Sequence, residues 1–244
     1  MKNNSLKGLL LVISFSVSIL GYSQIHDTHL WTGAGLSMEL NDKVSVDYKM
    51  QTRFYKNAGA LRVYLNQIGG TYKVGSGIKV GLKYRYSRKK KDYYFVNENR
   101  IILDGSYGYK IREINTKLTA RIRYQHAFDR LTTINETITP NTSDVFRIRL
   151  LAKYKNRDFK RVQPFIGYEY FKSLNPEPIN FPVNAYRILA GVNLDLPFKH
   201  ELKLNYIYQA SNKSAPEVDH IYAIQYTYNL SGLLGKDKKK YNLK

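Results

Sequence analysis

The chain has 244 residues, no cysteine and a formal net charge of +20 at pH 7. The absence of cysteine excludes a disulfide framework, thiolate chemistry and lipid attachment through an N-terminal cysteine. The length suits one domain or one large β-structure. The charge favours an anionic partner, such as nucleic acid, an anionic lipid headgroup or an acidic ligand, but 22 tyrosines are unusual for a soluble nucleic-acid-binding protein.

The N-terminus has the pattern of a secretory signal peptide. Lys2 and Lys7 precede the apolar run 8–20, which is short for a membrane span, and small residues follow it. We therefore predict removal of residues 1–23 and a mature chain of residues 24–244; a membrane anchor is the alternative. The mature chain keeps 37 basic against 19 acidic residues, a net charge of +18, and its export argues against nucleic acid as the partner.

Apolar and polar side chains alternate with a period of two through most of the mature chain, which is typical of β-strands with two different faces. In 116–125, for example, leucine, isoleucine and tyrosine share one face, and two arginines share the other. The alternation in 60–74 changes phase, which predicts a β-bulge near Asn66 and Gln67. The segments that alternate in this way are 28–40, 44–54, 60–74, 79–87, 97–111, 116–125, 146–154, 161–172, 184–194, 201–210 and 220–230.

These segments are long enough to cross a membrane. A tilted strand needs roughly 9–11 residues to span a bilayer, and most of the segments reach that length. Many have tyrosines toward their ends, where the ring can lie in the apolar zone while its hydroxyl remains in water. Because every backbone N–H must be paired in lipid, a sheet can cross only as a closed barrel. We therefore predict an all-β fold, a closed antiparallel up-and-down transmembrane β-barrel of about 10–12 strands.

The connectors alternate between short and longer segments, as expected for a meander whose two rims face different compartments. Eleven segments alternate, but bacterial single-chain barrels have even strand numbers, so we favour ten or twelve strands over eleven. A soluble secreted β-barrel or sandwich, with its apolar face inside, is the alternative.

The basic faces of the strands are expected to line the lumen. A lysine or arginine on the lipid face would cost about 2–4 kcal/mol at the membrane midplane, so the apolar faces are expected to point outward. The expected lumen-facing basic residues are Lys49, Arg53, Lys79, Lys83, Arg85, Arg100, Arg121, Arg123, Arg147, Arg149, Lys153 and Arg187. They form either a path or site for small anionic solutes, or a filled lumen in which they pair with Glu39, Asp47, Asp104 and Glu169.

Two further basic segments are candidates for contact with anions. Arg88, Lys89, Lys90 and Lys91 are expected on a loop outside the membrane, where they bind lipopolysaccharide phosphates or another surface anion, or are only solvated. The basic tail 236–244 either contacts anionic lipid or is a disordered end.

The sequence contains no motif for a metal, cofactor or catalytic site. The five histidines form neither HxH nor HExxH. His126 could be combined with Ser87 or Ser106, but nothing in the spacing supports a nucleophile and its base. Trp31 is expected to be an interface or packing anchor rather than a ligand platform. We therefore predict no metal, no cofactor and no enzyme activity.

Seven segments, taken in order along the chain, carry a family resemblance. They are 30–54, 69–87, 98–111, 118–126, 146–155, 162–171 and 186–196. In this order they resemble the DUF2490 family, uncharacterised outer-membrane-type β-barrel proteins of Bacteroidetes. The resemblance implies an outer-membrane location, but it implies no activity and no catalytic residues.

Together these observations predict an exported, monomeric outer-membrane β-barrel whose partners are outer-membrane lipid and lipopolysaccharide, and not nucleic acid. The predicted role is non-enzymatic: the basic lumen passes or binds small anionic solutes, or the barrel is a structural and adhesive surface protein. The alternatives are a membrane-embedded enzyme that acts on lipid or lipopolysaccharide, and a soluble secreted β-domain that binds an anionic ligand.

Overall fold

The computed structural model describes residues 25–90, 94–129, 142–155, 161–174, 184–211 and 217–231. The expected signal peptide 1–23, the predicted anion contact Lys91 and the basic tail 236–244 lie outside the described residues. Within the described ranges, no helix is long and apolar enough to cross a membrane.

The described chain is almost entirely β-structure, because alternating apolar and polar residues suit a sheet whose two faces meet different surroundings. A short 3-10 helix, η1 (Pro197–Lys199), joins two of the strands. The strands of the described residues are β1 (Ile25–Glu39), β2 (Val44–Tyr55), β3 (Ala60–Lys73), β4 (Ile78–Lys90), β5 (Phe95–Ile111), β6 (Thr116–Asp129), β7 (Thr142–Tyr154), β8 (Val162–Ser173), β9 (Asn184–Leu196), β10 (His200–Ser211) and β11 (Glu217–Asn229).

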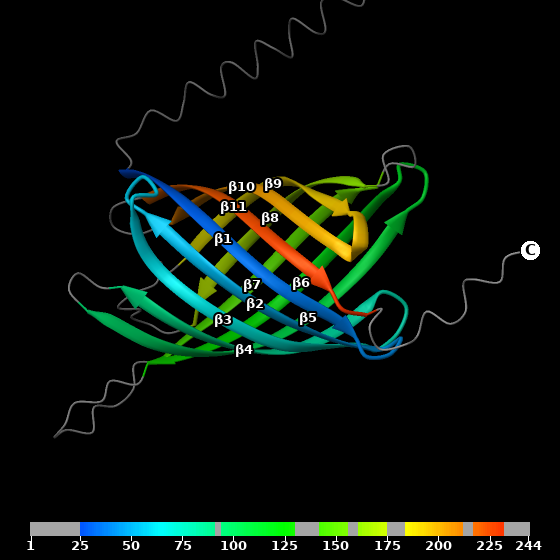
Figure 1. The fold of residues 1–244 in the computed structure, drawn as a ribbon, viewed down its shortest axis with the longest axis horizontal. Helices are drawn as coiled ribbons and strands as arrows, with labels where there is room; N and C mark the ends of the chain where they lie inside the picture. The colour runs from blue at the N-terminus through cyan, green and yellow to red at the C-terminus, as the bar shows by residue number, and fades with distance from the viewer. Residues whose placement is uncertain are drawn as a thin grey trace, which may run out of the picture.

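The eleven strands close into one barrel in the order β1-β11-β10-β9-β8-β7-β6-β5-β4-β3-β2 (Figure 1). Strands that follow one another in the chain pair antiparallel, whereas β1 and β11 pair parallel, from Ile25 opposite Glu217 to Ser37 opposite Asn229. The predicted closed barrel is confirmed. Eleven strands lie within the predicted range of about 10–12, but the preference for ten or twelve over eleven is wrong. Ten of the eleven pairings are antiparallel, as predicted, and one is parallel. An odd-numbered meander ends with its first and last strands running in the same direction, so one parallel pair must close it.

Side-chain exposure shows which face of each strand is outside. Successive residues point to opposite faces of a strand. Leu82, Ile122 and Leu150 are more than half exposed, whereas Ile102 and Gln125 on the other face are almost fully buried. Large exposed apolar side chains occur on all eleven strands. The outer wall is therefore apolar, and the buried side chains of the fold fill the inside of the barrel.

The β-bulge lies at a different place from the one expected. The register between β2 and β3 shifts between Arg53 and Phe54, which pair with Val63 and Leu61. Arg62 is therefore the extra residue, not Asn66 or Gln67. From Val63 onward the alternation continues without a change of phase, so Val63, Leu65 and Gln67 all face inward and are buried. The bulge was misplaced because Leu61 before the exposed Arg62 faces outward, whereas Val63 and Leu65 after it face inward, and all three are apolar.

The two rims of the barrel differ in their connections, and we name them accordingly. The long-connector rim is where β1 and β11 begin and where β2 ends; the short-connector rim is where β1 and β11 end and where β2 begins (Figure 1). Residues 40–43, 74–77 and 112–115 connect strands at the short-connector rim.

Candidate functional site in the barrel interior

The predicted lumen-facing cations lie at inward positions of six strands, β2, β4, β5, β6, β7 and β9. Arg100, Arg123 and Arg147 are buried. Lys79, at the short-connector rim, is exposed. The other eight are partly exposed: Lys49, Arg53, Lys83, Arg85, Arg121, Arg149, Lys153 and Arg187.

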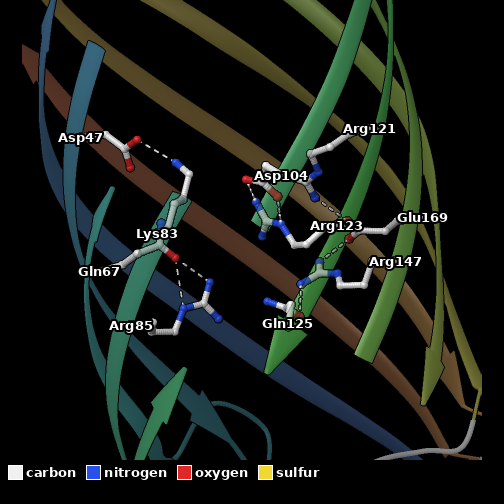
Figure 2. A network of polar contacts seen from close by, with 10 residues as sticks. All are labelled: Asp47, Gln67, Lys83, Arg85, Asp104, Arg121, Arg123, Gln125, Arg147 and Glu169. Atoms are coloured by element: carbon white, nitrogen blue, oxygen red, sulfur yellow. Dashed lines mark hydrogen bonds and ion pairs between the residues drawn. The ribbon is translucent and has the colours of Figure 1, made fainter. Parts of the chain in front are cut away.

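Glu169 on β8 is the centre of the largest ion-pair network (Figure 2). Its carboxylate accepts hydrogen bonds from Arg121 of β6 and Arg147 of β7, each at 2.7 Å, and lies 3.8 Å from Arg187 of β9. Arg147 also donates to Gln125 at 3.2 Å. Glu169 is only 2 % exposed. A carboxylate buried to this degree requires paired, hydrogen-bonded cations, and three strands supply them.

Smaller ion pairs lie along the neighbouring strands. Asp104 accepts two hydrogen bonds from Arg123, at 2.5 and 2.7 Å, and Asp47 accepts one from Lys83 at 2.7 Å (Figure 2). Arg85 donates two hydrogen bonds to the amide oxygen of Gln67, at 2.7 and 3.1 Å. Three of the four acids expected to pair in the lumen thus do so; Glu39 forms no ion pair with any described residue.

Glu98 is a further lumen acid with cationic partners, and it was not among the predicted ones. It pairs with Arg100 at 2.8 Å and with Lys89. Its position two residues before Arg100 puts it on the same face of the strand, which is the signal that could have found it.

The segment expected to form a basic surface loop is mostly part of β4. This strand continues to Lys90, so the expected loop is wrong for Arg88, Lys89 and Lys90. Lys89 points inward to Glu98, whereas Arg88 and Lys90 are exposed. The strand extends because β5 pairs with it as far as Phe95 opposite Lys90.

Two aromatic rings and three arginines form a stack across the barrel, which we call the cation–π ladder. The guanidinium of Arg53 lies 4.0 Å from the centre of the Trp31 ring, and that of Arg187 lies 5.3 Å from the same ring. Arg187 is also 4.5 Å from the ring of Phe171, whose other neighbour, Arg147, is at 4.2 Å. Trp31 is therefore an inward packing anchor. At these distances the positive charge of a guanidinium is attracted to the electron-rich face of the aromatic ring.

An apolar cluster packs beside the ladder. It consists of Trp31, Leu189, Ile207, Ile221 and Ala223, from β1, β9, β10 and β11. The aliphatic members were not predicted to face inward as a packed group, because most of the inward residues on these strands are polar. Small barrels are commonly filled by side chains, and here part of that filling is apolar.

Four partly exposed inward cations, which we call the surplus cations, form neither an ion pair nor a side-chain hydrogen bond with any described residue: Lys49, Arg149, Lys153 and Lys203. Arg53 and Arg85 also lack an ion pair, but they donate to the amide oxygens of glutamines. The Nε atom of Arg149 is buried and has no hydrogen-bond partner among the described residues. Lys203 lies 4.6 Å from the ring of Phe165. Lys203 was absent from the predicted site, although it alternates with leucines on β10 in the same way as the predicted residues.

Serine and histidine are not brought together. His126 pairs in register with Ile101 and Asp144, and its Nδ1 lies 2.8 Å from the Asp144 carboxylate. Ser106 lies opposite Arg121, and Ser87 lies opposite Leu65. In the part of the chain that the structure describes, no group of three or more histidine or acidic side chains could hold a metal ion.

Comparisons with known proteins give a family and distant structural likenesses. The family described as "Protein of unknown function (DUF2490)" matches residues 28–220. No curated protein matches the chain. The beta domain of the Bordetella autotransporter Brka is 12 % identical, with a TM-score of 0.49 over 74 % of this chain and 81 % of that one. The translocator domain of the autotransporter NalP from Neisseria meningitidis is 10 % identical, with a TM-score of 0.43 over 74 % and 72 % of the two chains.

Proposed function

The chain belongs to the DUF2490 family, and we propose that it is a non-enzymatic outer-membrane β-barrel whose cationic interior binds small anionic solutes. The outer wall supports the membrane location. Its strands have 12 to 17 residues, longer than the roughly 9–11 that a tilted strand needs to cross a bilayer. Exposed apolar side chains surround the barrel on every strand, and a soluble monomer rarely exposes apolar patches larger than a few hundred Å².

Hydrogen-bonded tyrosines on the outer wall also suit a membrane. Their hydroxyls donate to side chains on neighbouring strands, nearer to the long-connector rim, so the rings can lie in the apolar zone while the polar groups meet the interface. The pairs are Tyr48–Asn66 at 2.7 Å, Tyr84–Asn99 at 2.6 Å, Tyr86–Asn97 at 2.9 Å, Tyr124–Asp144 at 2.6 Å and Tyr170–Asn184 at 3.2 Å.

The surplus cations are the single observation that carries the anion-binding proposal. The lumen acids Asp47, Glu98, Asp104 and Glu169 are engaged in ion pairs with other cations. The charges of Asp195 and Glu201 act on Lys153, and that of Glu201 acts on Lys203, but neither acid forms an ion pair with these lysines. A partly buried positive charge without an ion pair is costly, and a soluble anion relieves that cost. Rings of lysine and arginine select anions in known pores.

Two measurements test the proposal. After membrane fractionation, the mature chain is expected with the outer membrane; its recovery with soluble periplasmic proteins would favour the secreted β-domain instead. Calorimetric titration of the purified full chain in detergent is expected to show binding of phosphate or citrate. A chain that binds neither anion would contradict the proposed function.

A further inference from the structure

We infer that the anion site is one-ended: a small oxyanion with at least two negative charges reaches Lys49, Arg149 and Lys203 from the short-connector rim, and the cation–π ladder closes the lumen beyond it. This inference rests on the proposed function and narrows it to a ligand class, three residues and one direction of entry.

The cation–π ladder crosses the lumen from wall to wall. Its ends, Arg53 and Arg147, stand on β2 and β7, which are five strands apart one way around the barrel and six the other way. The intermediate members contact one another at 4.0 to 5.3 Å between charge and ring centre. Trp31 and Arg147 are each 9 % exposed. Arg53, Phe171 and Arg187 are partly exposed, so the ladder is a row of contacting side chains from one wall to the other, buried at Trp31 and Arg147.

Beyond the ladder, toward the long-connector rim, the interior is dry. Leu65 faces inward and is 2 % exposed, and the side chain of Glu98 is only 3 % exposed. Closely packed interiors have few voids larger than a water molecule. An anion has no space to approach from this side.

Toward the short-connector rim, the exposure of the inward residues is uneven: Gln163, Phe165 and Asn193 are buried, whereas the charged residues of this half are at least partly exposed. The side chains of Asp47 and Lys83 are 32 % and 15 % exposed although they are paired with each other. Lys49, Arg149 and Lys203 are likewise partly exposed. Their partial exposure is the basis for placing the entry of a small solute at the short-connector rim.

The three cations surround one region of the lumen. Lys49 on β2 and Arg149 on β7 stand on opposite walls, and Lys203 on β10 lies three strands from each. The charge of Lys203 repels that of Lys49 and that of Arg149. Like charges held together in a partly buried site favour an anion between them.

The cations also indicate the kind of anion. Three positive charges meet at the site, so an ion with several negative charges neutralises them better than chloride does. The guanidinium of Arg149 is planar, and its Nε–H has no partner among the described residues; this geometry suits the oxygens of a carboxylate or a phosphate. The lysines add flexible point charges. We therefore assign the ligand to the small polyvalent oxyanions, whether phosphates or polycarboxylates.

The ligand class and the residues are tested by calorimetry on the purified full chain in detergent, with phosphate, citrate and chloride as probes. Phosphate or citrate is expected to bind at least tenfold more tightly than chloride. Lys49→Gln, Arg149→Gln and Lys203→Gln are each expected to weaken that binding about tenfold or more. Lys172→Gln is the matched control, because Lys172 is exposed near the opposite rim, and it is expected to leave the affinity unchanged.

The outcomes distinguish a failure of the proposed function from a failure of the assigned residues or ligand class. If the unmodified chain binds no anion, the proposed function fails. If it binds oxyanions but all three variants bind like the control, the function stands and the assigned residues are wrong. If citrate binds most tightly, the ligand is assigned to the polycarboxylates, and if phosphate does, to the phosphates. Tighter binding of chloride than of either oxyanion would overturn the ligand class. Circular dichroism of each variant verifies that the barrel is folded.

The closed end is tested by conductance in planar bilayers. The unmodified barrel is expected to pass little ionic current, because the ladder blocks the lumen. Trp31→Ala removes the ring between Arg53 and Arg187 and is expected to raise the current, whereas Tyr222→Ala on the outer wall is not. A steady anion-selective current through the unmodified barrel would overturn the one-ended site.

Discussion

The two halves of the barrel interior have the same alternation of apolar and polar residues, but their charged side chains differ in burial. In the half near the long-connector rim, the acids Glu98 and Glu169 are nearly fully buried, and arginines and aromatic rings surround them. In the half near the short-connector rim, the pair between Asp47 and Lys83 is partly exposed, and so are the surplus cations. The position of aromatic and aliphatic side chains on the inward face, rather than the number of cations, separates a packed core from an accessible site.

The largest effect is expected in the dry half, from Glu169→Gln. This change leaves the buried guanidinium groups of Arg121 and Arg147 without their carboxylate, and breaking a buried ion pair in this way costs about 3–5 kcal/mol. Urea unfolding of the barrel in detergent measures the loss in the free energy of unfolding. Glu39→Gln, at an exposed position, is the control and is expected to change stability by less than about 0.5 kcal/mol. Equal effects of the two changes would mean that the Glu169 network is not a structural core.

A second large effect is expected from Leu65→Ala. Leu65 is inward and 2 % exposed, so the change leaves a cavity in a packed interior and costs about 2–5 kcal/mol. Leu204→Ala is the matched change on the outer wall. There detergent or lipid chains replace the missing methyl groups, so the loss is expected to be smaller. The same unfolding measurement compares them, and a larger loss at Leu204 would show that the inside of the barrel is not its core.

The smallest effect on stability is expected in the accessible half, from Asp47→Asn. Its pair with Lys83 is partly exposed, and such pairs contribute about 0–1 kcal/mol. The loss is expected to vanish in about 1 M salt, because the screening length there is only about 3 Å, whereas the loss from Glu169→Gln persists. Unfolding curves at low and high salt give both values. A loss at Asp47 that salt leaves unchanged would contradict the division into a wet half and a dry half.

The same Asp47→Asn change also has an expected effect on anion binding. It releases Lys83, whose charge already acts on Lys49, and so adds a cation to the region of the proposed site. Phosphate or citrate is therefore expected to bind more tightly, by a few fold. Weaker binding would indicate that Asp47 orients the site instead of neutralising it.

Much of this organisation follows from alternation alone. The strand segments, the outward apolar face and the inward positions of the arginines depend on local period-two patterns, which a sequence displays directly. The position of the bulge at Arg62 could not be predicted, because Leu61, Val63 and Leu65 are all apolar and fit either face. The eleven alternating segments match the eleven strands, but the general rule that bacterial single-chain barrels have even strand numbers favoured ten or twelve.

The partners of the inward side chains could not be predicted. Trp31 reaches Arg187 although β10 and β11 lie between their strands. Which cations remain without an acid also depends on how all eleven strands close. Lys203 could have been found from its own alternation with leucines; its surplus charge could not, because that depends on neighbours from β7 and β2.

The parallel seam between β1 and β11 has a consequence for the order of assembly. Ile25 must meet Glu217, a residue near the opposite end of the chain, whereas every other strand pairs with its neighbour in sequence. Contacts between such distant residues form late and slowly, because the intervening chain must be ordered first. Until then the N-terminal strand has an unsatisfied edge, which is a template for pairing with another chain. Synthesis of the last strand is thus the event that protects the first one from self-association.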